Sequence, residues 1–249
     1  MFTTKLAALA VAAGLLAADP AAQAQSFNEG FNGADIPAGW VTTNLSSRAS
    51  LGYTWSAGPG ITNDTGTANV VSPFEGDGMA VVNFNSIGSG SGTINNWLIS
   101  PLITGLDNGD TFSFYTSTKP GSAYPDRLEF RLSTSGASTD VGSSTTSVGV
   151  FTTTLLTINP TLAHGGYPEV WTQYTVTLSG LPGPTDGRAA LRYFVTSAGP
   201  GGSNSNAIAV DAFSYTALSA VPEAAPWTML LAGMGVMALV RRGRQGLQA

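Results

Sequence analysis

Thr111-Phe112-Ser113-Phe114-Tyr115 and Arg127-Leu128-Glu129-Phe130-Arg131-Leu132 decide the fold, because both stretches alternate apolar and polar residues. Successive side chains of a β-strand point to opposite faces, so this alternation is typical of a strand with one buried face. Tyr174-Thr175-Val176-Thr177-Leu178 repeats the pattern. We therefore expect half-buried strands at these three places.

The rest of the chain between residues 25 and 220 has the same character. Further short strands are predicted near 51–56, 67–72, 78–84, 93–99, 148–157, 188–196 and 207–216, with loops rich in Gly, Ser, Asn and Pro between them. The 31 glycines and 14 prolines argue against a helical bundle, and 43% apolar residues supply a core. These observations predict an all-β fold, an antiparallel β-sandwich of jelly-roll type.

Composition also excludes several functions. Cysteine is absent and His164 is the single histidine, which excludes thiolate nucleophiles, disulfides and zinc sites made of Cys and His. His164 lies in a predicted loop and receives no role. From residue 25 to residue 221 there are six basic and thirteen acidic residues, a net charge of −7 that argues against nucleic acid as a partner.

The N-terminus has the pattern of a secretory signal peptide. Lys5 precedes an apolar run from Leu6 to Ala18, and small residues follow at Ala22 and Ala24. We expect residues 1–24 to be a signal peptide, cleaved by signal peptidase between Ala24 and Gln25. A buried N-terminal helix is the alternative. The signal peptide implies passage through the export machinery.

The C-terminus carries a second apolar segment, which is followed directly by basic residues. Residues 224–240 contain no charged residue, and as a helix of 17 residues they would span about 25 Å. Arg241, Arg242 and Arg244 come next and would be retained on the cytoplasmic side. We therefore predict a transmembrane helix over 224–240 with the preceding domain outside; a buried core helix is the alternative.

Residues 221–245 resemble the PEP-CTERM sorting signal of Gram-negative bacteria that make extracellular polysaccharide. The resemblance rests on Val221, Pro222 and Glu223, on the apolar segment from Pro226 to Gly235, and on the arginine cluster. It implies recognition by an exosortase, a membrane transpeptidase that would remove the tail. Ala224 stands where the family usually has a second proline, which puts the efficiency of processing in question.

The domain between the two signals resembles the choice-of-anchor J domain, which is similar to cleaved-adhesin and MAM-like jelly rolls. The resemblance covers nearly all of residues 25–220. It is carried by Phe27–Phe31 with Ile36–Trp40, by Asn96-Trp97-Leu98-Ile99-Ser100-Pro101, by Trp171–Val176 and by Ile208–Phe213. Such domains are surface modules with varied anchors, so the resemblance implies binding or architecture and no catalytic residues.

Two carboxylates in the first and last predicted strands are candidate metal ligands. Glu29 shares a strand face with Phe27 and Phe31, and Asp211 shares one with Ala209 and Phe213. A buried carboxylate needs a partner, and oxygen ligands suit Ca²⁺. We expect these strands to be neighbours and Glu29 and Asp211 to hold a structural calcium, to which the family resemblance also points. The alternative is that each carboxylate accepts backbone N–H or hydroxyl hydrogen bonds.

Other polar and aromatic residues have simpler interpretations. Arg127, Glu129 and Arg131 are expected on an outward, solvated strand face. Glu75 and Asp77 flank a glycine in a predicted turn, although such pairs also serve glycosidases. Trp97 and Trp171 are expected in the core, whereas Trp55 is the candidate for an exposed ring that stacks on sugars.

The sequence thus predicts an exported, non-catalytic β-sandwich that serves as a binding or structural module. It would pass through an intermediate anchored in the inner membrane before it reaches the cell surface or extracellular matrix of a Gram-negative bacterium. Extracellular polysaccharide is a candidate partner. The alternative function is a carbohydrate-active jelly-roll enzyme that uses paired carboxylates.

Overall fold

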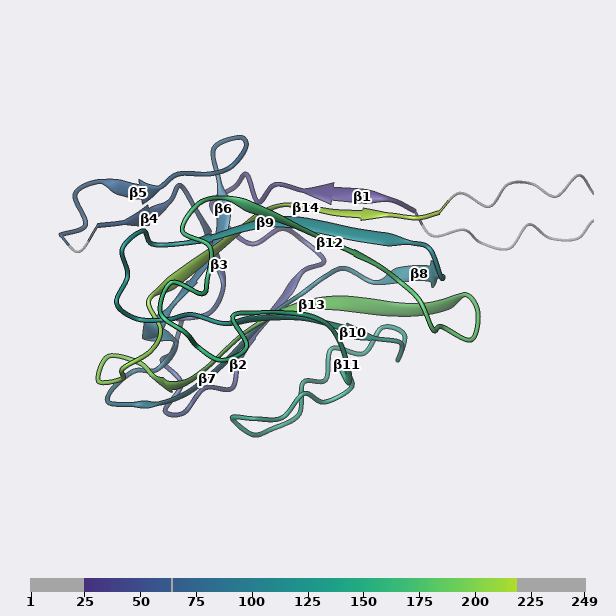
Figure 1. The fold of residues 1–249 in the computed structure, drawn as a ribbon. Helices are drawn as coiled ribbons and strands as arrows, with labels where there is room; N and C mark the ends of the chain where they lie inside the picture. The colour runs from purple at the N-terminus through teal and green to yellow at the C-terminus, as the bar shows by residue number, and fades with distance from the viewer. Residues whose placement is uncertain (1–24, 64, 219–249) are drawn as a thin grey trace, which may run out of the picture.

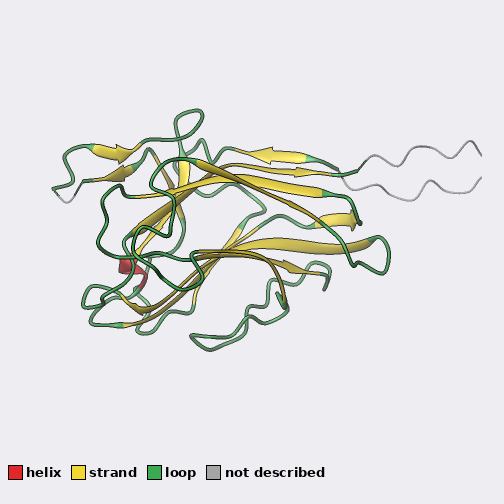
Figure 2. Cartoon of the chain, in the orientation of Figure 1, coloured by secondary structure: helices red, strands yellow, loops and turns green. Residues whose placement is uncertain are grey.

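The computed structural model describes residues 25–63 and 65–218, which form two antiparallel sheets packed face to face (Figure 1). The described part is almost entirely strand and loop, with one short 3-10 helix, η1 (Phe84–Ser86) (Figure 2). No helix in it is long and apolar enough to cross a membrane. The predicted signal peptide and the predicted sorting signal with its helix lie outside the described residues.

The first sheet contains β1 (Phe27–Glu29), β3 (Ser56–Gly58), β6 (Met79–Asn83), β9 (Thr111–Thr118), β12 (Thr172–Thr177) and β14 (Ala207–Thr216). Their order is β12-β9-β14-β6-β3. β6 pairs with the first half of β14, and β1 pairs with its second half. The first and last strands of the described chain are therefore neighbours.

The second sheet contains β2 (Val41–Asn44), β7 (Gly92–Ile99), β8 (Ile103–Leu106), β10 (Leu128–Ser133), β11 (Thr153–Ile158) and β13 (Thr185–Ala198). Their order is β11-β10-β13-β7-β2, and β8 pairs with the start of β13. A separate hairpin of β4 (Ile61–Thr62) and β5 (Asn69–Val71) covers part of the first sheet from outside.

The main core lies between the sheets and is rich in aromatic rings. Phe213 of β14 contacts rings from both sheets, with centroids 6.0 Å from Phe112, 6.4 Å from Phe114 and 6.1 Å from Phe130. All four side chains are fully buried. These phenylalanines are the apolar positions of the alternating stretches, so the packing confirms the half-buried strands and the predicted sandwich.

One predicted strand is wrong. Residues 51–55 form turns, and β3 begins only at Ser56. Gly52 has a φ of +78°, which ends any extended run there. The Tyr53 carbonyl accepts side-chain hydrogen bonds from Asn44 and Asn96 instead of joining a sheet ladder.

The strand directions place the described chain ends at one end of the sandwich. Phe27 pairs with Tyr215, and the Ala217 N–H donates to Ser26 Oγ over 3.0 Å. At the opposite end lie the loops that follow β2, β6, β9, β11 and β13. Figure 1 shows β1 and the end of β14 side by side, away from these loops. We call the loop-bearing end the distal end.

Candidate functional site

Asp211 lies on the outer face of the first sheet, because β14 contains a bulge immediately after it. The register with β9 shifts between Asp211 and Ser214, and Ala212 has a φ of +48°. Ala209 therefore joins an outer cluster with Met79, whereas Phe213 enters the core between the sheets. The expectation that Asp211 shares a face with both residues is wrong for Phe213, since the extra residue of a bulge reverses the alternation.

Backbone N–H groups hold the Asp211 carboxylate. Phe74 and Glu75 donate to Oδ2 over 2.8 and 3.2 Å, and Ala212 donates to Oδ1 over 2.6 Å. Burial raises the pKa of Asp211 above its ordinary value; these three donors oppose the rise, and the neighbouring charge of Glu75 adds to it. Asp211 thus fixes the turn that contains residues 73–78 onto β14.

Glu29 lies beside this turn, at the end of β1. Its Oε1 accepts the Phe31 N–H over 2.8 Å, and Phe31 itself has a φ of +51°. The Glu75 carboxylate approaches from the turn: its Oε1 is 3.4 Å from the position that a Cβ on Gly30 would occupy. β1, β14 and the turn that carries Glu75 therefore meet at one junction.

The junction offers oxygen atoms, which are the ligands that Ca²⁺ takes. Its carboxylates alone supply fewer of them than calcium needs. Ca²⁺ takes six to eight oxygen ligands, including carboxylates and backbone carbonyls. Within the described ranges, no three carboxylate or imidazole groups lie close enough together to form a metal site by themselves. Backbone carbonyls would have to complete a site built on Glu29 and Asp211. The hydrogen bonds of both carboxylates correspond to the alternative that needs no metal.

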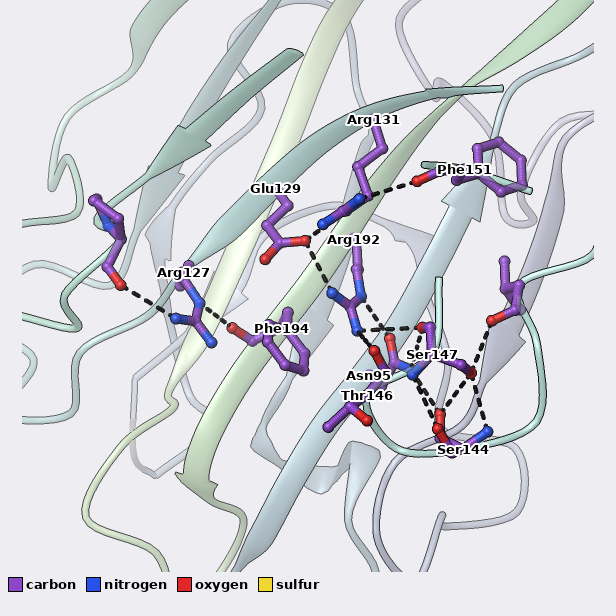
Figure 3. A network of polar contacts seen from close by, with 12 residues as sticks. Asn95, Arg127, Glu129, Arg131, Ser144, Thr146, Ser147, Phe151, Arg192 and Phe194 are labelled. Carbon is purple, nitrogen blue, oxygen red and sulfur yellow. Dashed lines mark hydrogen bonds and ion pairs between the residues drawn. The ribbon is translucent and has the colours of Figure 1, made fainter. Parts of the chain in front are cut away.

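A buried ionic network lies on the outer face of the second sheet (Figure 3). Glu129 Oε2 accepts from Arg131 Nε over 2.7 Å and from Arg192 Nη1 over 2.9 Å. Arg192 also donates to Asn95 and to two carbonyls of the 144–147 segment, and its guanidinium lies 3.7 Å from the ring centroid of Phe194. The side chain of Arg192 is only 2% exposed.

The expectation of an outward, solvated face for Arg127, Glu129 and Arg131 is therefore wrong for the centre of this face. Segment 134–152, the long connection from β10 to β11, covers it with Val141 and Phe151. Burial lowers the pKa of Arg192 to about 10, and Glu129 opposes the fall. Burial alone would raise the pKa of Glu129, but Arg131 and Arg192 outweigh it and hold that pKa below its ordinary value.

The tryptophans differ from expectation at two positions, Trp55 and Trp171. Trp55 is only 1% exposed and donates from Nε1 to the Asn96 carbonyl, so it is not the exposed ring that the sequence predicted. Trp97 is fully buried, as expected, beneath segment 134–152. Trp171 is partly buried against the outer cluster of the first sheet and donates to the Ser72 carbonyl.

The remaining acids give no support to a paired-carboxylate enzyme. Glu75 and Asp77 are exposed on their turn, as the simpler interpretation predicted. Asp126 and Glu129 are buried, and each is held by several side-chain or backbone donors. His164 lies exposed in its loop.

Asn95 and Asn96 are two of the buried polar residues that sequence reasoning passed over. Both are fully buried in the middle of β7. Asn95 points to the ionic network, and Asn96 serves the distal end by donating to Ser86 Oγ and to the Tyr53 carbonyl. Two adjacent amides inside an apolar strand were the available signal, because a buried amide is retained only where it finds partners.

Comparison with solved structures identifies the fold. The K1 cleaved adhesin domain of Lys-gingipain from Porphyromonas gingivalis W83 superimposes with a TM-score of 0.52 at 24% identity, over 78% of this chain and 99% of that domain. The fold is cleaved-adhesin-like. The K3 domain of the same protein gives a TM-score of 0.50 at 22% identity, over 77% of this chain and 99% of that domain. At these identities the likeness establishes the fold alone.

Other comparisons add no family. A xylan-binding domain from Paenibacillus barcinonensis gives a TM-score of 0.36 at 10% identity, over 81% of this chain and 100% of that domain, which is too low to indicate a ligand. No known protein family and no curated protein matches the sequence. The adhesin likeness agrees with the jelly-roll resemblance noted in the sequence.

Proposed function

We propose that the protein is an exported, non-catalytic module that is delivered to the cell surface or extracellular matrix and binds a partner there. The observation that carries this proposal is the pairing of Phe27 with Tyr215. It brings Gln25, the residue after the predicted cleavage point, and Leu218, which precedes the predicted tail, to one end of the sandwich. A tether at that end leaves the distal loops pointing away from the membrane.

Sorting is the second part of the proposal. Pro222, Glu223, the apolar segment 224–240 and the following arginines support an exosortase-type transpeptidase as the processing partner, with a transient intermediate in the inner membrane. Domain limits of 1–24, 25–220 and 221–245 follow from the same features. β14, the last strand of the described residues, ends at Thr216, which supports placing the end of the domain after it.

Mass spectrometry of cell-surface and culture fractions tests sorting directly. In producing cells we expect a chain without residues 1–24 and without the arginine cluster; cells that lack the exosortase should retain the tail peptide in the membrane fraction. The Pro222→Ala, Glu223→Ala double variant should behave like the deletion, and Asp35→Asn in an exposed loop should behave like wild type. An intact tail in equal amounts in all strains would refute sorting.

Structural calcium at Glu29 and Asp211 is part of the proposal for the domain. Its support is the meeting of β1, which carries Glu29, with β14 and the turn of Glu75, where the Glu75 charge further raises the pKa of Asp211. A bound cation would relieve that repulsion. It would also link β1, β14 and the turn, and so stabilise the pairing of the first and last strands.

A further inference from the structure

A depression of about 200 Å³ opens at the distal end, between the loop before β3 and strand β6. Its lining residues come from two segments, Gly52, Tyr53, Thr54 and Ser56 on one side and Val81, Val82, Asn83 and Ser86 on the other. Asn83 pairs with Ala207 at the start of β14, which is the end of that strand farthest from the tether.

The lining mixes polar and apolar groups and carries no charge. It offers the hydroxyl groups of Thr54 and Ser56, an amide at Asn83, and the side chain of Tyr53, a residue that is 50% exposed. Asn83 Oδ1 accepts the Asn85 N–H. The Nδ2 group of the same side chain is therefore the donor that Asn83 can offer to a ligand. Anionic ligands are usually recognised by Arg or Lys, and no such residue lines the depression.

Two amides behind the depression, that of fully buried Asn96 and that of half-buried Asn44, fix both of its walls. Asn44 Nδ2 donates to the carbonyls of Tyr53 and Ser86 over 2.8 and 2.9 Å. Asn96 Nδ2 reaches the same two residues, the Tyr53 carbonyl over 3.3 Å and Ser86 Oγ over 2.9 Å. Each amide thus joins the loop on one side to η1 on the other.

Asn96 uses its other polar groups in the same way. Its Oδ1 accepts from Thr54 Oγ1 over 2.9 Å, and its backbone carbonyl accepts from Trp55 Nε1. Burying an amide in a core strand has a free-energy cost that its partners offset. Here the side-chain partners of Asn96 belong to a wall of the depression, and its carbonyl binds the adjacent Trp55. These hydrogen bonds hold the depression in its shape before a ligand binds.

We propose that this depression binds one neutral sugar residue of a polysaccharide, with Tyr53 as the stacking ring and Asn83, Thr54 and Ser56 as partners for sugar hydroxyls. The inference rests on the proposed function and names its ligand class. The volume is below the roughly 300 Å³ at which pockets for drug-sized ligands begin, which fits a single ring of a longer polymer. Many such modules on one cell give the avidity that a shallow site needs.

Calorimetric titration of the mature chain, purified from producing cells, tests the site. The probes are cellotetraose, laminaritetraose and mannotetraose as neutral sugars, alginate tetramer as a charged sugar, and the polysaccharide isolated from the same cells. We expect at least one neutral probe to bind and alginate to bind less. Tyr53→Ala should weaken binding about tenfold, and Tyr53→Phe should restore most of it because the ring remains.

Tyr124→Ala is the matched control, because Tyr124 is a 48% exposed tyrosine on another distal loop. It should bind like wild type. Thermal unfolding of each variant establishes that the fold is kept. If Tyr53→Ala and Tyr124→Ala bind the isolated polysaccharide equally well, the site is refuted while the proposed function stands.

Absence of binding to every saccharide, or binding to alginate in preference to the neutral probes, also overturns the inference. The sorting experiment has an independent readout in the tail peptide, so it judges the proposed function separately.

Discussion

Thr118 Oγ1 lies 2.6 Å from Asp126 Oδ2 in the buried region between β9 and β13. The same hydroxyl lies 2.8 Å from the Ala207 carbonyl, and a hydroxyl has only one proton to donate. Both contacts are satisfied if Asp126 is protonated and donates to Thr118, which then donates to Ala207. Burial raises the pKa of Asp126, although Thr118, Tyr193 and Asn206 oppose the rise, and this direction agrees with a neutral carboxyl group.

Asp126→Asn should therefore preserve the fold, because the amide NH₂ can donate to Thr118 Oγ1 in place of the carboxyl proton. A folded-state pKa above the unfolded value means that stability is greatest below the unfolded pKa and falls as pH rises through the folded pKa. We expect this fall in wild type and its absence in the variant. Free energies of unfolding measured by urea denaturation from pH 4 to pH 8 provide the check. Parallel curves for the two proteins would contradict a neutral Asp126.

Glu129→Gln should destabilise the protein by about 3 kcal/mol at pH 7, because it leaves Arg192 buried without a counter-charge. The folded pKa of Glu129 is lowered, so its contribution is present above the unfolded pKa and is lost as pH falls through the folded pKa. The difference between variant and wild type should therefore shrink in acid. Urea denaturation at pH 7 and pH 3 measures it, with the exposed-loop variant Asp35→Asn as control. A gap of equal size at both pH values would argue against an ionic origin.

Calcium should raise the melting temperature, and a chelator should reverse the rise. A site held at 100 times its Kd gains about 2.7 kcal/mol. Asp211→Asn should abolish the calcium response, whereas Asp35→Asn should keep it. The melting temperatures of all three proteins, measured by calorimetry with and without roughly 5 mM calcium as a saturating amount, test whether calcium binds at this site. If wild type melts at one temperature throughout, Glu29 and Asp211 serve only as hydrogen-bond acceptors.

Ala212→Gly should stabilise the protein by about 0.5 to 1 kcal/mol. The left-handed backbone at Ala212 has a steric cost that glycine lacks, and the greater freedom of glycine in the unfolded chain offsets only part of the gain. Ala57→Gly in β3 is the control and should lose stability, since the backbone of Ala57 has no positive φ that glycine could relieve. Equal losses in both variants, measured by chemical denaturation, would show that the bulge carries no backbone strain.

The sandwich could be predicted from the sequence because alternation reports directly which side chains face the core. Phe112, Phe114 and Phe130 occupy the core positions that their spacing indicated. The pairing of the first and last strands was also predicted, and β1 does lie beside β14. The assignment of residues to a strand face failed where the strand contains a bulge. Asp211 and Phe213, on either side of the bulge in β14, lie on opposite faces although their spacing predicted one face.

The burial of residues on the outer faces of the two sheets could not be predicted, because it depends on loops that cover those faces. The alternation of apolar and polar residues within a strand does not indicate such loops. Arg127, Glu129 and Arg131 have the pattern of a solvated face, and only the 134–152 segment makes the centre of that face a buried one. The depression beside Tyr53 was equally hidden, since its walls come from segments about 30 residues apart. Asn96 joins them through contacts that no local pattern predicts.

The position of β14 determines how the domain would bear mechanical load. A pull between the tail, beyond Leu218, and a ligand at the distal loops runs along the axis of β14. The hydrogen bonds of this strand to β9, β6 and β1 lie across that axis, so they would be loaded together in shear and not peeled apart one at a time. A module tethered this way resists the drag of flowing water with most of one sheet at once.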